Sequence, residues 1–248
     1  MPSTARQRSN SEIYHVMARG VGKCIIYEDD ADRRAFLGIL ERERTEQGVT
    51  LHAWCLMDNH YHLLVQGELE DISKMMKRLN SAYAMAFNHK HDRSGHLFQG
   101  RFRSVAVESD EQFLTELRYI HQNPVKEKLC PTCDYPWSSF NGYFDRPWLV
   151  DNSLAVSMFG SEEQFREFHA QLDVTSPCLD IGRARRLFSS EDALLVARDV
   201  LGDVRLEEVA SLPRAKRNTA LRELKAAHLS LRQIERLTGV SKNIVERA

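Results

Sequence analysis

The chain has 248 residues, 42% of them hydrophobic and 28% charged, and its formal net charge is −1. This length can bury one sizeable core and a smaller one, so we expect two domains. No apolar run reaches the length of a membrane span, the first residues lack a secretory signal, and the five cysteines have scattered spacing, so we expect a cytoplasmic protein without a disulfide framework.

Hydrophobic patterning over the first 121 residues predicts the order strand, helix, strand, strand, helix, strand, helix. This order is typical of a ferredoxin-like antiparallel sheet with helices on one face, so the expected fold class is α+β. In the second predicted strand both alternating sets of side chains are largely apolar, which is typical of a strand covered on both faces. The expected elements are Ile13–Ala18, Asp32–Glu46, Val49–Met57, His60–Val65, Ile72–His89, Arg101–Val107 and Glu111–His121.

The second and third predicted strands form a hairpin, with Asp58-Asn59 as its tight turn. His60 and His62 follow this turn, and residues two apart on a strand project to the same face. Two imidazoles on one face near a hairpin bend can hold one metal ion. Taken alone, such a pair is more often structural, so the rest of the chain has to support the metal site.

The last predicted helix of this region carries a tyrosine and an asparagine four residues apart, Tyr119 and Asn123. Residues at this spacing lie roughly above one another on one helix face. Ser109 or Asp110 is expected to cap the start of the helix, and Pro124 disfavours helical structure at the residue before it. Taken alone, Tyr119 reads as a partly buried helix aromatic.

Five sequence blocks follow one another along the first part of the chain: residues 14–20, 54–65, 100–103, 117–125 and 135–139. In this order they resemble the single-tyrosine HUH transposases of the IS200/IS605 type, and in particular the REP-associated tyrosine transposases. The resemblance covers about residues 10–145. It implies a palm with a ferredoxin-like sheet, Tyr119 as the nucleophile, and His60 and His62 as metal ligands. It also implies a third ligand one helical turn after the tyrosine, at Asn123, near which His121 and Gln122 are competing donors.

The chemistry of a DNA strand transferase requires these residue types. A phosphodiester repels nucleophiles, and a divalent ion can neutralise the charge that develops on its oxygens. A phenol has a reference pKa near 10, so Tyr119 needs the metal or a neighbour to draw its proton away. Two imidazoles and one amide oxygen suit Mg²⁺ or Mn²⁺ with open positions, whereas a closed structural zinc site normally has four tight ligands. The resemblance implies a 5′-phosphotyrosine and a free 3′-hydroxyl.

The net charge conceals an uneven distribution along the chain. Residues 151–180 hold one Lys or Arg against six Asp or Glu, whereas residues 181–248 hold 14 against nine. Residues 71–108 hold seven basic against three acidic side chains, a stripe that can follow a phosphate backbone. The candidate DNA contacts are Arg19, Lys74, Arg101, Arg103, Lys242, Asn243 and Arg247.

The second half of the chain predicts a linker and a helical domain. We expect a catalytic domain over residues 1–145, an acidic linker over 146–180 with a helix candidate at 161–172, and a small all-α domain over 181–248. Residues 231–247 have the pattern of a helix-turn-helix, with Gly239 in the turn and Ser241 capping the second helix. The alternative is a helical bundle that only packs or dimerises.

These observations predict a metal-dependent transposase that cleaves and rejoins single-stranded, hairpin-forming DNA. Three other classes stay open: a rolling-circle type nickase, a non-catalytic DNA-binding regulator, and a zinc-dependent hydrolase that leaves Tyr119 idle. The resemblance allows either a homodimer that exchanges tyrosine helices or a monomer that acts alone.

Overall fold

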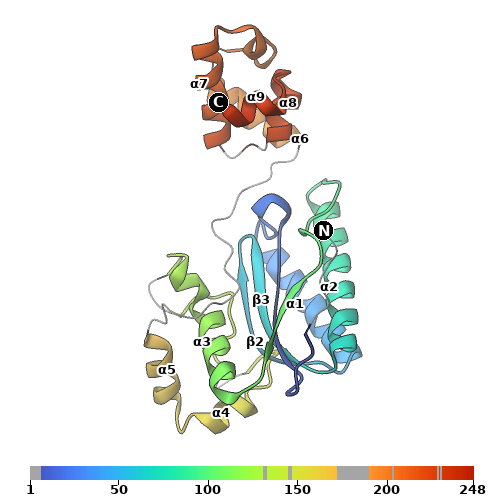
Figure 1. Ribbon diagram of the computed structural model, residues 1–248, viewed down its shortest axis with the longest axis vertical. Helices are drawn as coiled ribbons and strands as arrows, with labels where there is room; N and C mark the ends of the chain where they lie inside the picture. The colour runs from blue at the N-terminus through green and yellow to red at the C-terminus, as the bar shows by residue number, and fades with distance from the viewer. Residues whose placement is uncertain are drawn as a thin grey trace. The chain divides into compact units, whose positions relative to one another are not determined.

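The structure is a computed structural model, in which residues 7–130, 133–144, 147–171, 190–202, 204–227, 229 and 231–248 are described. These residues divide into two compact units (Figure 1). The described residues up to 171, apart from His91–Arg93, form the first unit, and those from 190 onward group with His91–Arg93 in the second. Among the described residues, no helix has both the length and the apolar character that crossing a membrane requires.

The first unit is built on a four-stranded sheet in the order β2-β3-β1-β4, in which every neighbouring pair is antiparallel. This is the ferredoxin-like arrangement that the element order predicts, and the expected α+β class is confirmed. The elements of this unit are β1 (Ile13–Arg19), η1 (Val21–Lys23), α1 (Asp30–Glu46), β2 (Thr50–Met57), β3 (His60–Gln66), α2 (Leu69–Lys90), β4 (Arg103–Val107), α3 (Asp110–Lys126), α4 (Ser153–Met158) and α5 (Glu162–Ala170).

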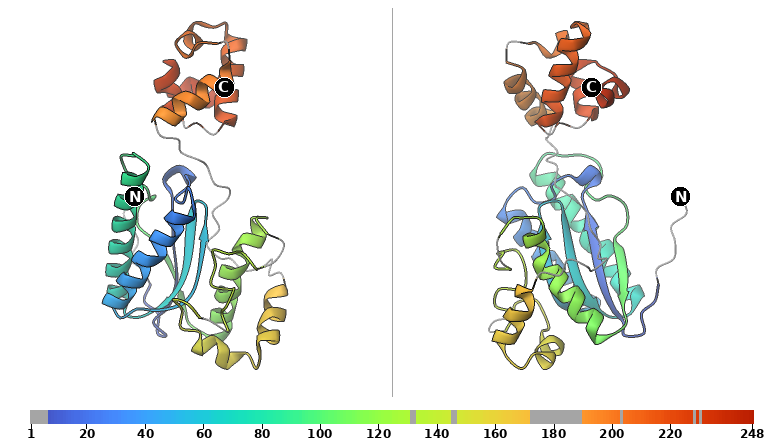
Figure 2. Two further views of the ribbon diagram at one scale, coloured as in Figure 1. Left: turned by 180° about the vertical axis from the view of Figure 1, so that it is seen from behind. Right: turned by 60° about the vertical axis from the view of Figure 1, so that its left-hand side comes forward.

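Helices cover both faces of this sheet, as Figures 1 and 2 show. Tyr61 of β3 packs against Phe36 of α1, and its hydroxyl donates to Asn80 of α2, so α1 and α2 share one face as expected. Leu64 points to the other face, where it packs with Phe113 of α3. The histidine face of β3 therefore lies under α3, and β2 is buried along nearly its whole length between the two layers.

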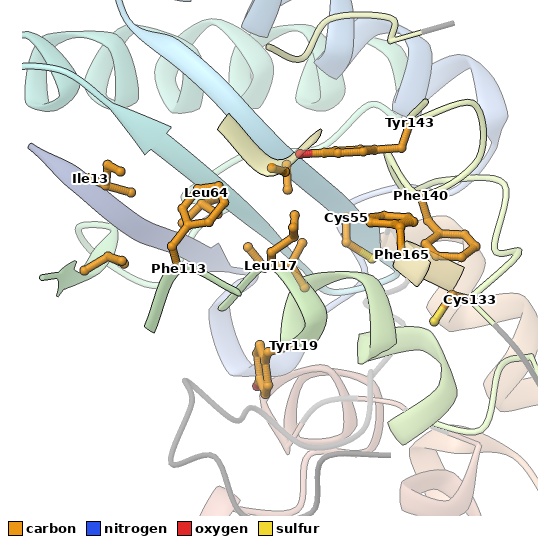
Figure 3. Packing of buried hydrophobic residues seen from close by; sticks show 14 of the residues in the cluster. Ile13, Cys55, Leu64, Phe113, Leu117, Tyr119, Cys133, Phe140, Tyr143 and Phe165 are labelled. Carbon is orange, nitrogen blue, oxygen red and sulfur yellow. The ribbon is translucent and has the colours of Figure 1, made fainter. Parts of the chain in front are cut away.

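The core between the sheet and α3 fixes the position of that helix. Figure 3 shows Phe113 and Leu117 reaching from α3 toward Leu64 and Cys55, whereas Tyr119 lies at the edge of the cluster. Each fully buried leucine or phenylalanine contributes about 1.5–3 kcal/mol to folding. The helix is therefore held by its apolar side chains, and Tyr119 is carried with it.

Helix α3 extends further than the sequence predicts. The Ser109 side chain accepts a hydrogen bond from the Gln112 amide, which confirms the expected cap. The predicted end at His121 is wrong, because the helix continues through Pro124 to Lys126. A proline inside a helix costs roughly 3 kcal/mol, and burial of this last turn offsets that cost. As a result Asn123 is helical and buried.

Residues 146–171, expected to belong to a linker, are part of the first unit wherever they are described. Phe165 of α5 stacks on Tyr143 with ring centroids 5.1 Å apart, and on Phe140 with centroids 5.4 Å apart. The acidic side chains Glu163 and Glu167 of the same helix are exposed. The linker prediction is therefore wrong for this stretch, because its acidic composition belongs to the solvent face of an amphipathic helix. The rest of the predicted linker, residues 172–180, lies outside the described residues.

The second unit is a bundle of short helices around its own core. Every helical segment contributes at least one buried side chain to this core, among them Ala197, Val209, Leu221, Ile234 and Val245. A turn with a positive φ of 71° at Gly239 joins the last two helices, where the sequence predicts the turn of a helix-turn-helix. The segments are α6 (Ser190–Leu201), η2 (Leu206–Ser211), α7 (Arg214–Ala226), α8 (Leu231–Thr238) and α9 (Lys242–Arg247).

The start of α9 differs from the expected cap. Ser241 occupies the cap position, but its side chain makes no capping hydrogen bond. The Lys242 amide instead donates to the carboxylate of Glu235 on α8, at 2.8 Å. This contact joins the two helices directly, and a carboxylate at a helix N-terminus is favourable because the first amides there lack intrahelical acceptors.

Candidate active site

Two imidazoles and one amide meet between β3 and α3. His60 and His62 point to the same side of the strand, and both are buried. Nε2 of His60 lies 3.3 Å from Oδ1 of Asn123, and Nε2 of His62 lies 3.2 Å from Nδ2 of the same amide. The structure thus brings together the three side chains that the sequence predicts as metal ligands.

The two competing donors on α3 point elsewhere. Both ring nitrogens of His121 lie within hydrogen-bond distance of other groups, 3.0 Å from His169 Nε2 and 2.8 Å from Ser139 Oγ. Gln122 donates from Nε2 to the carbonyl of His169 at 2.6 Å. These two side chains hold α5 and the segment around Ser139 against α3. Of the three candidates for the third ligand, only Asn123 faces the histidine pair.

Tyr119 lies on the same stripe of α3 as Asn123. Residues i, i+3 and i+7 of a helix share one face, so Glu116, Tyr119 and Asn123 all face the sheet. The Tyr119 ring packs edge-on against the imidazole of His62, with centroids 5.6 Å apart. Lys126 Nζ lies 4.2 Å from the centroid of the same ring. The predicted nucleophile therefore adjoins the predicted ligands within one chain.

A second layer of side chains anchors the two imidazoles. His60 Nδ1 lies 2.6 Å from Oδ1 of Asn59. His62 Nδ1 lies 2.7 Å from Nε2 of His15 on β1, and Nδ1 of His15 lies 2.6 Å from a carboxylate oxygen of Glu116. The Nδ1 atoms of both candidate ligands are thus held by neighbours, which aims both Nε2 atoms at Asn123.

Burial keeps His62 in its neutral form. Loss of solvation lowers the pKa of His62 well below its usual value, and the nearby His60, His15 and Lys126 lower it further. A neutral imidazole is the form that binds a metal ion, because its unprotonated nitrogen keeps a lone pair.

The donor set fits a hard divalent cation. Asn59 donates from Nδ2 to the Lys23 carbonyl, so its oxygen is the atom that faces His60 Nδ1, and in neutral His60 the single N–H is Nδ1–H. The lone pair on His60 Nε2 then faces the lone pairs of the Asn123 oxygen, an arrangement that a cation stabilises. In the described part of the chain, no three His, Cys, Asp or Glu side chains are grouped to hold a metal ion. The amide oxygen of Asn123 is the oxygen donor that faces the two imidazoles, and an N,N,O set of this kind suits Mg²⁺ or Mn²⁺ better than a closed zinc site.

Three of the predicted DNA contacts gather in one place. Arg19, Arg101 and Arg103 line a hollow of about 340 Å³ together with Gln99, whose side-chain oxygen accepts from Arg19 Nε at 2.8 Å. Arg19 ends β1, directly opposite His60 in the β1–β3 register. The three guanidinium groups therefore lie near the end of the sheet that carries the histidine pair.

The other predicted DNA contacts are not among the residues that line this hollow. Lys74 is near the start of α2, which follows the end of β3 opposite His60, and it pairs with Asp71 at 2.7 Å. The hydrogen bond that Lys74 donates to Asp71 raises the pKa of Lys74. Lys242, Asn243 and Arg247 are exposed on α9 in the second unit.

Two residues of this site have no role in the sequence analysis: His15 and Glu116. Each carries a signal that points inward. His15 lies in the centre of an apolar strand, and Glu116 lies three residues before Tyr119 on the same helix face. Patterns in a single sequence cannot predict that these two residues meet, because the contact joins residues that are 101 positions apart.

Comparison with known proteins gives one family and two solved structures. Residues 9–123 match the family described as transposase, IS200-like. A structure of a REP-associated tyrosine transposase bound to a REP hairpin is 16% identical, covers 62% of this chain and 94% of its own, and has a TM-score of 0.46. A crystal structure from Deinococcus radiodurans R1, described as a candidate transposase, is 19% identical, covers 49% of this chain and 97% of its own, and has a TM-score of 0.34. No curated protein matches the chain.

Proposed function

We propose that the protein is an IS200-like transposase, the family whose model residues 9–123 match, and that it is a metal-dependent enzyme that cleaves and rejoins single-stranded DNA. In this proposal Tyr119 is the nucleophile, and His60, His62 and Asn123 hold Mg²⁺ or Mn²⁺. The substrate is a strand that folds into a hairpin or palindrome. The observation that carries the proposal is the meeting of both Nε2 atoms at the Asn123 amide, beside the ring of Tyr119.

The reaction that we propose exchanges one phosphate ester for another. The Tyr119 oxygen attacks phosphorus and forms a P–O bond, while the bond to the 3′-oxygen breaks and that oxygen takes up a proton, equivalent to the one that the phenol loses. The products are a 5′-phosphotyrosine and a 3′-hydroxyl, and attack by a 3′-hydroxyl on the link regenerates the phenol. A bound divalent ion supplies polarisation of the phosphate oxygens. The phosphotyrosine preserves the phosphate ester bond that cleavage would otherwise lose, so rejoining requires no nucleotide hydrolysis.

We further propose that each chain carries a complete site. The candidate ligands come from β3 and α3, and the nucleophile comes from the same α3. Tyr119 is 5% exposed and packs against His62 of its own chain. No exchange of helices between two chains is needed to bring the phenol to the imidazoles.

The proposed path of the DNA uses the arginine hollow. Arg19, Arg101 and Arg103 lie near the histidine end of the sheet, and guanidinium groups bind phosphates in a bidentate way. For the second unit we propose DNA binding through the exposed residues of α9. Replacement of Lys242 and Arg247 by Gln should then weaken hairpin binding and leave the amount of covalent adduct at saturating DNA unchanged.

The experiment that tests the chemistry uses labelled single-stranded hairpin DNA and Mg²⁺ or Mn²⁺. The parent protein should form an adduct that survives denaturation, Tyr119→Phe should form none, and chelation should abolish it. Tyr143→Phe is the matched control, since it also removes a buried hydroxyl from the first unit but one that bonds the His52 carbonyl. Cleavage that persists in Tyr119→Phe would support a metal-dependent hydrolase. Binding without cleavage by every variant would support a non-catalytic regulator.

The ligand assignment has its own test. Asn123→Ala should weaken Mn²⁺ binding roughly tenfold or more, which corresponds to at least about 1.4 kcal/mol. Its neighbour Gln122→Ala should not, because that side chain bonds α5. Binding of Mn²⁺ to the metal-free protein is read from the electron paramagnetic resonance signal of the free ion. Equal affinities for the two variants would remove Asn123 from the site.

A further inference from the structure

A chain of buried polar side chains runs from the candidate ligand His62 back into the protein. Its members are His62 on β3, His15 on β1 and Glu116 on α3, and the successive atom pairs lie 2.7 Å and 2.6 Å apart. His15 and His62 are fully buried, and Glu116 is 6% exposed. His15, on β1, therefore connects His62 on β3 to α3, the helix that carries Tyr119.

The hydrogens of this chain can be placed from its ends. Glu116 accepts when it is ionised, so the hydrogen between it and His15 is on Nδ1 of His15. In neutral His15 the Nε2 atom is then an acceptor, and His62 must donate to it from Nδ1. A neutral His62 that donates from Nδ1 keeps its lone pair on Nε2, the atom that faces Asn123. Each choice follows from the previous one, and only one tautomer of His62 satisfies all of them.

We propose that His15 and Glu116 are positioning residues for His62, which fix the tautomer and ring orientation of that metal ligand. The inference rests on the metal site of the proposed function. Without the two residues the Nδ1 and Nε2 tautomers of His62 differ less in energy, and a fraction of the molecules presents an N–H where a metal ion needs a lone pair. Partners of this kind behind a metal ligand contribute about 10- to 100-fold in metal affinity or activity.

A comparison within the same unit separates this role from ordinary core packing. His121 is also fully buried, and both its nitrogens are within hydrogen-bond distance of partners, yet those partners are His169 and Ser139. A buried histidine of this fold is thus satisfied without an ionised group. A buried carboxylate costs several kcal/mol in lost solvation, and Glu116 places this cost directly behind a candidate ligand. The place of Glu116 behind His15 and His62, rather than the need to satisfy a buried histidine, therefore explains why a carboxylate is buried here.

The test measures Mn²⁺ affinity by electron paramagnetic resonance in the full-length protein. His15→Phe keeps a ring against Tyr119, whose centroid lies 5.8 Å from that of His15, but removes the acceptor for His62. It should weaken Mn²⁺ binding about 10- to 100-fold. Glu116→Gln keeps the shape and removes the charge, and should weaken binding by a smaller factor. The control His121→Phe removes an equally buried histidine that is not part of the His62–His15–Glu116 series, and it should keep the parent affinity.

A second measurement needs no metal and no activity. Nitrogen-15 NMR of the histidine rings should find His62 protonated at Nδ1 in the metal-free parent, and a mixture of tautomers in His15→Phe. Parent affinity and an unchanged His62 tautomer in folded His15→Phe and Glu116→Gln would overturn the inference. If instead His62→Ala binds Mn²⁺ as tightly as the parent, the metal site itself is wrong and the proposed function fails with it. The two failures are therefore distinct.

Discussion

Phe165 provides the sharpest test of the packing that supports the site. This side chain is 2% exposed and stacks on Tyr143 and Phe140 at interplanar angles of 8° and 22°. Truncation to alanine leaves a cavity between the two rings, and such a change typically costs about 3–5 kcal/mol. In a domain of 150–250 residues this corresponds to a fall in melting temperature of roughly 6–20 °C.

The measurement can be confined to the first unit. The three tryptophans of the chain, Trp54, Trp137 and Trp148, all belong to it, so tryptophan fluorescence follows its unfolding in urea. Glu167→Ala on the exposed face of the same helix is the control, with an expected change within about 0.5 kcal/mol. A cost below about 1 kcal/mol for Phe165→Ala would mean that α5 is not docked in solution and that the acidic stretch is a linker after all.

Three further predictions concern catalysis, pH and DNA. A mixture of Tyr119→Phe and His62→Ala proteins should form no more adduct on hairpin DNA than either alone, because one chain holds the whole site; recovered activity would indicate exchanged helices. Burial lowers the pKa of His169 to about 4, so between pH 6.5 and 4 the unfolded chain binds a proton that the folded chain does not. The free energy of unfolding should thus decrease as the pH is lowered through this window, by up to about 1.4 kcal/mol per pH unit from this residue. Urea unfolding at a series of pH values measures this dependence, and the same dependence in His169→Phe as in the parent would contradict the reasoning. Arg101→Gln should lower the slope of log affinity against log salt for single-stranded DNA by about 0.7, whereas Lys74→Gln, on a distant part of the surface, should leave it unchanged; the reverse result would move the DNA path to α2.

The sequence predicts the parts of the site that depend on local periodicity. Alternation along β3 is enough to place His60 and His62 on one face, and helical spacing is enough to place Asn123 beside Tyr119. The end of α3 is mispredicted because a local rule about Pro124 competes with burial of the surrounding turn, and burial is a property of the folded chain. Composition misleads in the same way at α5, where acidic side chains conceal an apolar face.

The missed residues depend on contacts between distant segments. His15 meets Glu116 only because β1 pairs with β3 while α3 crosses that face of the sheet. Lys74 fails to join the arginines for the converse reason, since the course of the chain carries α2 away from the histidine end before it returns. Patterns within one segment predict which way a side chain points, whereas the topology decides what it meets there.

The face of α3 that carries Glu116, Tyr119 and Asn123 fixes these three side chains to one helix. A slide or rotation of the whole helix would therefore move the carboxylate, the phenol and the amide together. Under the proposed function such a movement would change DNA cleavage and metal binding at the same time, so an effector that displaces α3 would act on both.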